Sequence, residues 1–207
     1  MKIVDVRTIV TCPGRNFVLL KIITDEGLYG VGDGTLNGRE LAVAEALREH
    51  IAPLLIGRDP DRIEDTWQYL FRGSYWRGGP VLNSALSAVD LAHVGGITEA
   101  RKIAAIAECY HVQTAWHGPP DIAPITHAAN VHLDLATPNF GVQEWVVHPP
   151  EVADVIHGGP TFADGYLNVS DAPGLGCDVD EAAAAKYPYR RGYLPVSRRA
   201  DGSVQDW

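Results

Sequence analysis

The chain has 207 residues, a formal net charge of −9 at pH 7, and a hydrophobic fraction of 46%. This length is enough for one large domain or two small ones, each with a buried core. An acidic chain gains little electrostatic attraction to phosphate backbones, which argues against nucleic acid as a partner.

No run of apolar residues approaches the roughly 18 that a membrane span needs, and the first residues lack the apolar segment of a signal peptide. Cys12, Cys109 and Cys177 are widely spaced and form no CxxC motif. This pattern is typical of free thiols in a reducing compartment. We therefore expect a cytoplasmic protein without a membrane partner.

Residues 1–92 have the pattern of a small α+β module. Apolar residues alternate over 2–10, and the apolar run 17–23 is followed by an Asp-Glu-Gly turn signal and a second run over 28–31. These runs predict a three-stranded antiparallel meander. A helix follows, with Asn37 as its expected cap and an apolar stripe at Leu41, Ala42, Ala44, Leu47 and Ile51.

Two more helices are predicted before residue 93. Asp61 is the expected cap of the first, whose apolar face contains Ile63, Trp67, Leu70 and Phe71. The second covers residues 81–92, after a glycine-rich joint.

Beyond residue 92 the pattern changes to strand–helix alternation. We expect a glycine-rich turn at 93–96, a helix over 97–110 capped by Thr98, a strand over 112–115, a helix over 122–136, and a strand over 142–147. The residues after about 148 are predicted to form an extended tail with a short helix over 180–186. Two such units cannot close a barrel, so the pattern indicates that this half is part of a larger domain.

Several phrases, taken in order, resemble the enolase superfamily, and its mannonate dehydratase family in particular. In the N-terminal half they are residues 32–40 (GDGTLNGRE) and 84–92 (SALSAVDLA). In the C-terminal half they are 93–100 (HVGGITEA), 116–121 (WHGPPD), 139–144 (NFGVQE), 173–176 (PGLG), 185–189 (AKYPY) and 206–207 (DW).

This resemblance implies an N-terminal α+β capping domain over residues 1–92, the last βα units of a (β/α) TIM-type barrel over 93–148, and a tail over 149–207 that wraps back on the capping domain. A complete barrel takes about 250 residues by itself. Residues 93–207 are far fewer, so the resemblance also implies that most of the central barrel is missing.

The family reaction is the Mg²⁺-dependent dehydration of a sugar acid, D-mannonate to 2-keto-3-deoxy-gluconate, with a gluconate-type dehydratase as a sister activity. By resemblance, the carboxylate ligands of Mg²⁺ and the acid–base residues belong to the missing segment, so we expect no metal ligands in this chain. The resemblance also implies a small sugar acid as partner and a homo-oligomer assembled through the capping domain.

The resemblance assigns four residues to the substrate site. His117 and Glu144 are the expected catalytic residues and also contact substrate, together with Asp121 and Asn37. Each also has a structural interpretation. His117 or Asp121 could cap the next helix, Glu144 could be the outward residue of an edge strand, and Asn37 could be a plain helix cap.

Three hypotheses stay open on the sequence. In the first, the chain represents a sugar-acid dehydratase. In the second, it is a truncated, non-catalytic or regulatory homologue. In the third, the protein has further residues between Ala92 and His93 that this numbering omits. Bonded neighbours lie about 3.8 Å apart at Cα, so the length of this junction separates the last two hypotheses.

Overall fold

The computed structural model describes residues 1–92, 98–192 and 196–205. The predicted turn at 93–96, the junction between Ala92 and His93, and the terminal phrase 206–207 lie outside these ranges. Within the described ranges, no helix is long and apolar enough to cross a membrane. Cys12, Cys109 and Cys177 are free, as predicted.

The N-terminal half contains the predicted antiparallel meander, which is confirmed. Its strands pair in the order β1–β2–β3, with Ile9 opposite Leu19 and Leu20 opposite Gly32. They are β1 (Ile3–Thr11), β2 (Phe17–Thr24) and β3 (Tyr29–Asp33).

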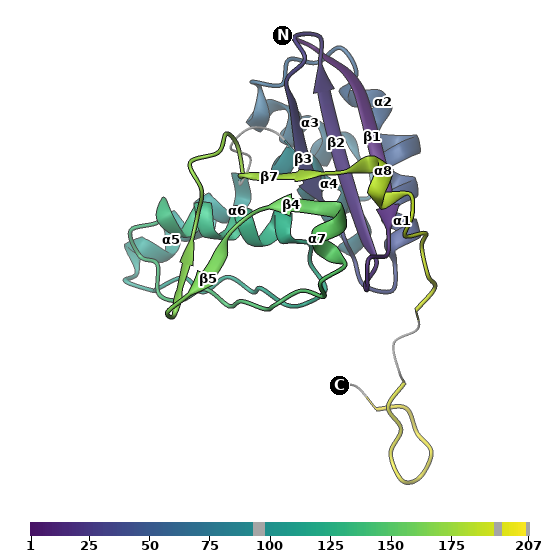
Figure 1. The fold of residues 1–207 in the computed structure, drawn as a ribbon, viewed down its shortest axis with the longest axis vertical. Coiled ribbons are helices and arrows are strands. Elements are labelled where there is room, and N and C mark those ends of the chain that lie inside the picture. The colour runs from purple at the N-terminus through teal and green to yellow at the C-terminus, as the bar shows by residue number, and fades with distance from the viewer. Residues whose placement is uncertain (93–97, 193–195, 206–207) are drawn as a thin grey trace.

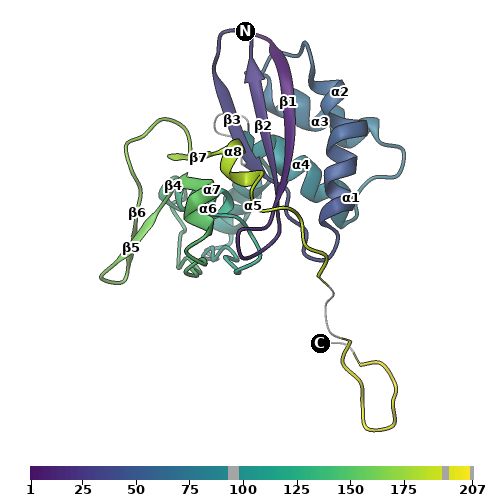
Figure 2. The same cartoon turned by 45° about the vertical axis from the view of Figure 1, so that its right-hand side comes forward.

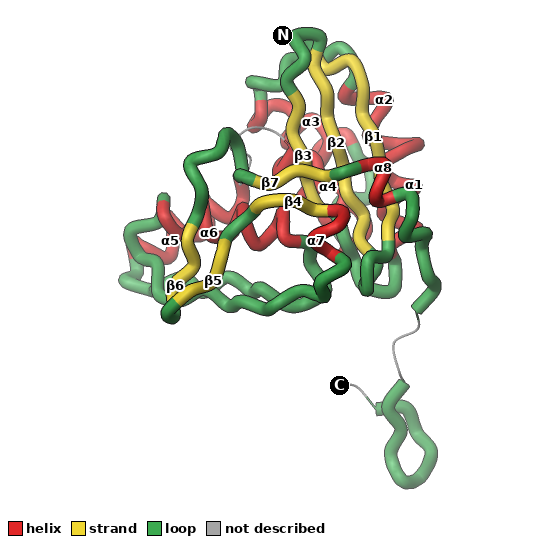
Figure 3. Tube along the Cα trace, viewed as in Figure 1, coloured by secondary structure: helices red, strands yellow, loops and turns green. Residues whose placement is uncertain are grey.

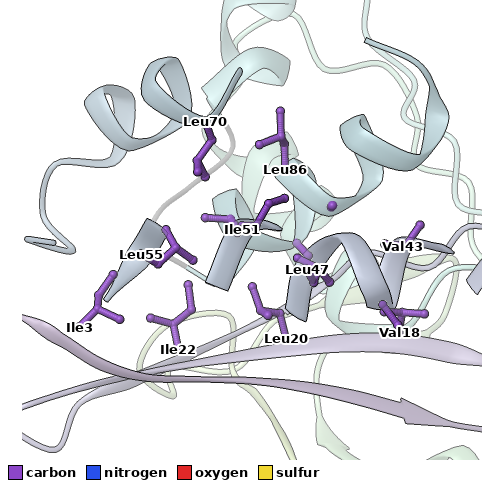
Figure 4. Packing of buried hydrophobic residues seen from close by; sticks show 14 residues of the cluster. Ile3, Val18, Leu20, Ile22, Val43, Leu47, Ile51, Leu55, Leu70 and Leu86 are labelled. Carbon is purple, nitrogen blue, oxygen red and sulfur yellow. The ribbon is translucent and has the colours of Figure 1, made fainter. Parts of the chain in front are cut away.

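Helices cover one face of this sheet (Figure 1). They are α1 (Glu40–Glu45), the π-helical segment η1 (Ala46–Ile51), α2 (Ala52–Leu55), α3 (Ile63–Gly73) and α4 (Pro80–Ala92). Because side chains alternate along a strand, Val18, Leu20 and Ile22 of β2 all point toward the helices. They form one core with the helix residues Val43, Leu47, Ile51, Leu55, Leu70 and Leu86 (Figure 4).

Two predicted helix caps and part of one apolar stripe are wrong. Arg39, not Asn37, precedes α1, and Arg62, not Asp61, precedes α3; neither helix has a side-chain cap. Leu41 is 43% exposed, whereas Val43 is fully buried. The buried positions Val43, Ala44, Leu47 and Ile51 follow the usual helical spacing, so the predicted stripe was wrong at Leu41 and Ala42, which lie on the exposed side of α1.

The C-terminal half contains two long helices, α5 (Thr98–Cys109) and α6 (Pro124–Leu135). The strands predicted over 112–115 and 142–147 do not form, and Figure 3 shows both stretches as loops. A single parallel bridge between Thr114 and Phe140 joins them. A strand needs neighbours to complete its hydrogen-bond ladder, and here each stretch has only the other.

The tail has more structure than predicted. The expected short helix forms as α8 (Glu181–Ala184), capped by Asp180. Five further elements are α7 (Val152–Val155), β4 (Ile156–Gly158), β5 (Thr161–Ala163), β6 (Tyr166–Asn168) and β7 (Cys177–Val179). Strand β4 pairs with β7, and β5 pairs with β6. Three-residue strands are too short to show a period of two, which explains why the sequence did not reveal them.

The part of the tail that contains α7, β7 and α8 lies against the second face of the meander, opposite the helices α1 and α2, whereas residues 196–205 extend away from it (Figure 2). Phe17 and Leu19 of β2 point to this face and form a second core with residues of α7, β7 and α8. The Thr11 hydroxyl donates to the Ala184 carbonyl at 3.0 Å, and the Cys12 amide donates to the Tyr187 carbonyl at 2.8 Å. Both faces of β2 are therefore buried, by segments from opposite ends of the chain.

Candidate functional site

The structure brings His117 and Glu144 together. The parallel bridge at Thr114 and Phe140 aligns two stretches that run in the same direction, and each of these residues follows the bridge by three or four positions. His117 Nε2 lies 3.4 Å from Glu144 Oε2. Both side chains are more than half exposed, at 77% and 53%, so a ligand from solvent can reach them.

Gly118 fixes the position of Glu144. Its amide donates a 2.8 Å hydrogen bond to Glu144 Oε2. A Cβ at Gly118 would overlap the Glu144 carbonyl oxygen and lie 3.1 Å from His127 Cε1. Only glycine allows the two backbones to come this close. The Glu144 carboxylate is therefore held beside the His117 ring by a backbone donor, an arrangement that can orient the imidazole.

Asp121 is not a helix cap. Helix α6 begins at Pro124, with Ala123 as its N-cap residue, and Asp121 lies in the turn before it. Proline at the first helical position sets the start of the helix. Asn37 lies exposed in the loop between β3 and α1. Neither Asp121 nor Asn37 is therefore the N-cap of the helix that follows it.

The sequence did not point to Asp33, which caps α6 from the other half of the chain. This carboxylate is only 4% exposed. Its Oδ2 atom accepts from the Ala123 amide at 2.7 Å and from the Thr126 hydroxyl at 2.8 Å. Its partners lie 90 and 93 positions away, so no local pattern could have revealed this role.

Behind this site lie buried polar groups. The His127 ring is fully buried and packs edge-on against Trp145 at 4.8 Å and His148 at 5.1 Å between centroids. Neither nitrogen of His127 has a hydrogen-bond partner of standard geometry in the described part of the chain, and both oxygens of Asp134 also lack one. Burial, followed by the nearby His148, lowers the pKa of His127 to about 4, and burial raises the pKa of Asp134 to about 7.

The described residues do not fit a Mg²⁺ site. Within residues 1–92, 98–192 and 196–205, no group of three or more His, Cys, Asp or Glu side chains could hold a metal ion. Mg²⁺ requires several oxygen ligands in near-octahedral geometry, and the His117–Glu144 pair offers only one carboxylate.

Two family profiles match this chain. The N-terminal domain of the mandelate racemase and muconate lactonizing enzymes matches residues 5–95, and the enolase C-terminal domain-like profile matches residues 85–183. A solved enolase from Pantoea ananatis, with bound D-gluconate and Mg, superposes with a TM-score of 0.89 at 24% identity, covering 92% of this chain and 95% of that one.

Among its relatives, a D-mannonate dehydratase from Caulobacter sp. (strain K31) is 30% identical over 402 aligned positions, which cover all of both chains. A D-galactonate dehydratase family member from Streptomyces bingchenggensis is 30% identical over 401 positions, covering 99% of this chain and 98% of the relative. Because this chain has 207 residues, nearly half of the 402 positions have no residue of this chain opposite them. Both domain profiles and these relatives together show that the chain belongs to the enolase superfamily, whose N-terminal capping and C-terminal barrel domains it matches and whose sugar-acid dehydratases are its relatives.

Proposed function

We propose that this chain retains the sugar-acid binding part of a mannonate dehydratase scaffold and lacks the central barrel segment with the Mg²⁺ ligands and the acid–base residues. One observation carries the proposal. His117 and Glu144 lie 3.4 Å apart, and each follows the bridge between two adjacent parallel stretches by three or four positions. Nearly half of the 402 positions aligned with the relative have no residue of this chain opposite them. Active sites of (β/α) barrels lie at these strand ends.

The exposed groups match the chemistry of an aldonic acid. His117 can donate to a hydroxyl or to the carboxylate, while Glu144 and Asp121 can accept from hydroxyl groups. Asn37 can do both, and it comes from the capping half of the chain. This combination favours a small polyhydroxylated acid. D-mannonate is the first candidate because of the relatives' names, and D-gluconate is the second because the solved Pantoea ananatis enolase holds it.

In the complete scaffold we expect removal of the proton next to the carboxylate, departure of the hydroxyl from the β-carbon, and tautomerisation of the resulting enol. The net result is loss of one water and a 2-keto-3-deoxy acid. A base near the α-carbon and an acid near the leaving hydroxyl are required. The resemblance places these groups outside the 207 residues, so we expect this chain to bind sugar acids without dehydrating them.

Titration calorimetry of the purified 207-residue chain tests this proposal, with D-mannonate and D-gluconate as ligands and with or without Mg²⁺. We expect binding of at least one acid, no dependence on Mg²⁺, and no 2-keto-3-deoxy acid. His117→Ala should weaken binding by about tenfold, as expected for the loss of one hydrogen bond to a charged group. The exposed His157, in β4, is the matched control for the same substitution. Formation of the keto acid, or no binding of either acid, would contradict the proposal.

An intact-mass measurement of the protein from its natural source separates this proposal from the alternative of an omitted middle. A continuous chain has a mass of 22.4 kDa. A mass close to that of its relatives would show that the central segment is present in the cell and that the full dehydratase exists.

A further inference from the structure

We propose that Asp33 is a positioning residue of the sugar-acid site. Its two carboxylate oxygens hold the loop that carries Asn37 and the loop that carries His117 and Asp121 in a fixed relation to each other. The sugar acid named as the ligand of this site comes from the function proposed above. The contacts on which it depends belong to the fold and can be tested without a ligand.

The first oxygen holds the capping-domain loop. Asp33 Oδ1 accepts from the Thr35 amide at 2.8 Å and from the Thr35 hydroxyl at 2.5 Å. The same hydroxyl accepts from the Val18 amide at 3.0 Å, and the Gly34 amide donates to the Val18 carbonyl at 2.8 Å. Residues 33–35 are therefore fixed to β2, and Asn37 follows two positions later.

The second oxygen holds the barrel loop. Asp33 Oδ2 accepts from the Ala123 amide and the Thr126 hydroxyl, in the first turn of α6. Ala123 has no side chain that could cap this helix, so the capping group comes from β3. Asp121 lies two positions before Ala123.

The loop is also tied to α6 at its other end. The Asn130 amide group donates to the His117 carbonyl at 3.3 Å. Between His117 and Asp121 lie Pro119 and Pro120, whose rings restrict the backbone. A displacement of the start of α6 is therefore passed on to the two barrel residues of the site.

A carboxylate is required because both oxygens of the Asp33 side chain accept hydrogen bonds, one from each loop. Asparagine has nearly the same shape, but it has one acceptor oxygen and an NH₂ group that can only donate. In Asp33→Asn, the amide can accept from Thr35 or from the α6 turn, but not from both. The NH₂ group then faces two donors in a site that is 4% exposed. Whichever loop keeps the amide oxygen, the other loses its acceptor, so the side chain no longer holds the two loops against each other and both should open more often while the fold remains intact.

Hydrogen–deuterium exchange of the full chain tests this coupling directly. We expect Asp33→Asn to speed amide exchange in both 33–39 and 117–126. The matched control is Asp180→Asn, because Asp180 caps α8 through one bond to the Ala183 amide at 2.9 Å, a position where asparagine caps equally well. Faster exchange in only one of the two segments, or in neither, would overturn the inference.

A double-mutant cycle then tests the effect on the site, with D-gluconate as the probe. In the wild type, Asn37→Ala should lower affinity by about tenfold. In the Asp33→Asn background the same change should have less than about a twofold effect, because Asn37 is no longer held in place. Equal factors in both backgrounds would show that Asp33 is only structural. If the wild type binds neither D-gluconate nor D-mannonate, the proposed function fails, while the exchange experiment still decides the role of Asp33; if it binds only D-mannonate, that acid replaces D-gluconate as the probe.

Discussion

His127 and Asp134 lie on the same helix, α6, and should make stability depend on pH in opposite directions. His127 is fully buried, and its pKa falls from 6.5 to about 4, mainly through burial and then through His148. Asp134 is 7% exposed, and burial raises its pKa from 3.8 to about 7. Burial outweighs the groups that favour the charged form of His127, namely the Glu144 carboxylate and the Pro119 carbonyl, and both oxygens of Asp134 lack a hydrogen-bond partner among the described residues.

The direction of each effect follows from which state binds the proton. Between pH 6.5 and about 4, the unfolded chain protonates His127 and the folded chain does not, so the free energy of unfolding falls as pH falls. Between pH 3.8 and about 7, the folded chain keeps the Asp134 proton and the unfolded chain loses it, so stability falls as pH rises. At about 1.4 kcal/mol per pKa unit, the totals are about 3 and about 4 kcal/mol.

The two effects oppose each other in the wild type, and each single substitution should expose the other. In His127→Phe, we expect stability to fall as pH rises from 4 to 7, because Asp134 remains. In Asp134→Asn, stability should rise over the same range, because His127 remains and burial also lowers the pKa of His148. Urea unfolding at several pH values gives the free energy of unfolding for each protein.

The exposed His50, changed to Gln, is the control, and its profile should follow the wild type. Parallel pH profiles for His127→Phe and Asp134→Asn would refute the reasoning, because they would mean that water or a local opening solvates both groups. At neutral pH, His127→Phe should cost little stability, since neither His127 nitrogen has a hydrogen-bond partner of standard geometry among the described residues.

Three further predictions concern packing. Gly118→Ala should displace the Glu144 backbone, because the added Cβ would overlap the Glu144 carbonyl oxygen. Calorimetry should then detect no sugar-acid binding, and the melting temperature should fall. Binding at wild-type affinity would contradict the close contact. Leu20→Ala should lower the free energy of unfolding in urea by about 2–5 kcal/mol, because Leu20 is fully buried. Leu41→Ala should lower it by less than about 0.5 kcal/mol, because Leu41 is 43% exposed. Equal losses would count against the assigned helix face. Val142 and Val147 are 64% and 83% exposed in one loop stretch, so the chain should self-associate through this apolar surface. Val147→Glu should reduce the association in light scattering, and a monomer at all concentrations would contradict the prediction.

The local sequence was enough for the elements whose partners are close in the chain. The meander connects neighbouring strands through short turns, and the amphipathic helices α3 and α4 need only a face of the right period. The resemblance also identified His117, Asp121, Glu144 and Asn37 as one set, and the structure places the first and third of these in contact. Their roles stay predictions until a ligand is measured.

The sequence by itself determined the superfamily, the capping sheet, the helices and the candidate substrate residues. Only the tertiary structure decided that the stretches 112–115 and 142–147 remain loops, that the tail buries the second face of β2, and that Asp33 caps α6. The physical reason is the same in all three cases. A ladder hydrogen bond, a buried face or a helix cap depends on a partner group outside the local sequence. The α6 cap and the cover of β2 come from distant parts of the chain, and the two stretches find no further strands to pair with among the described residues.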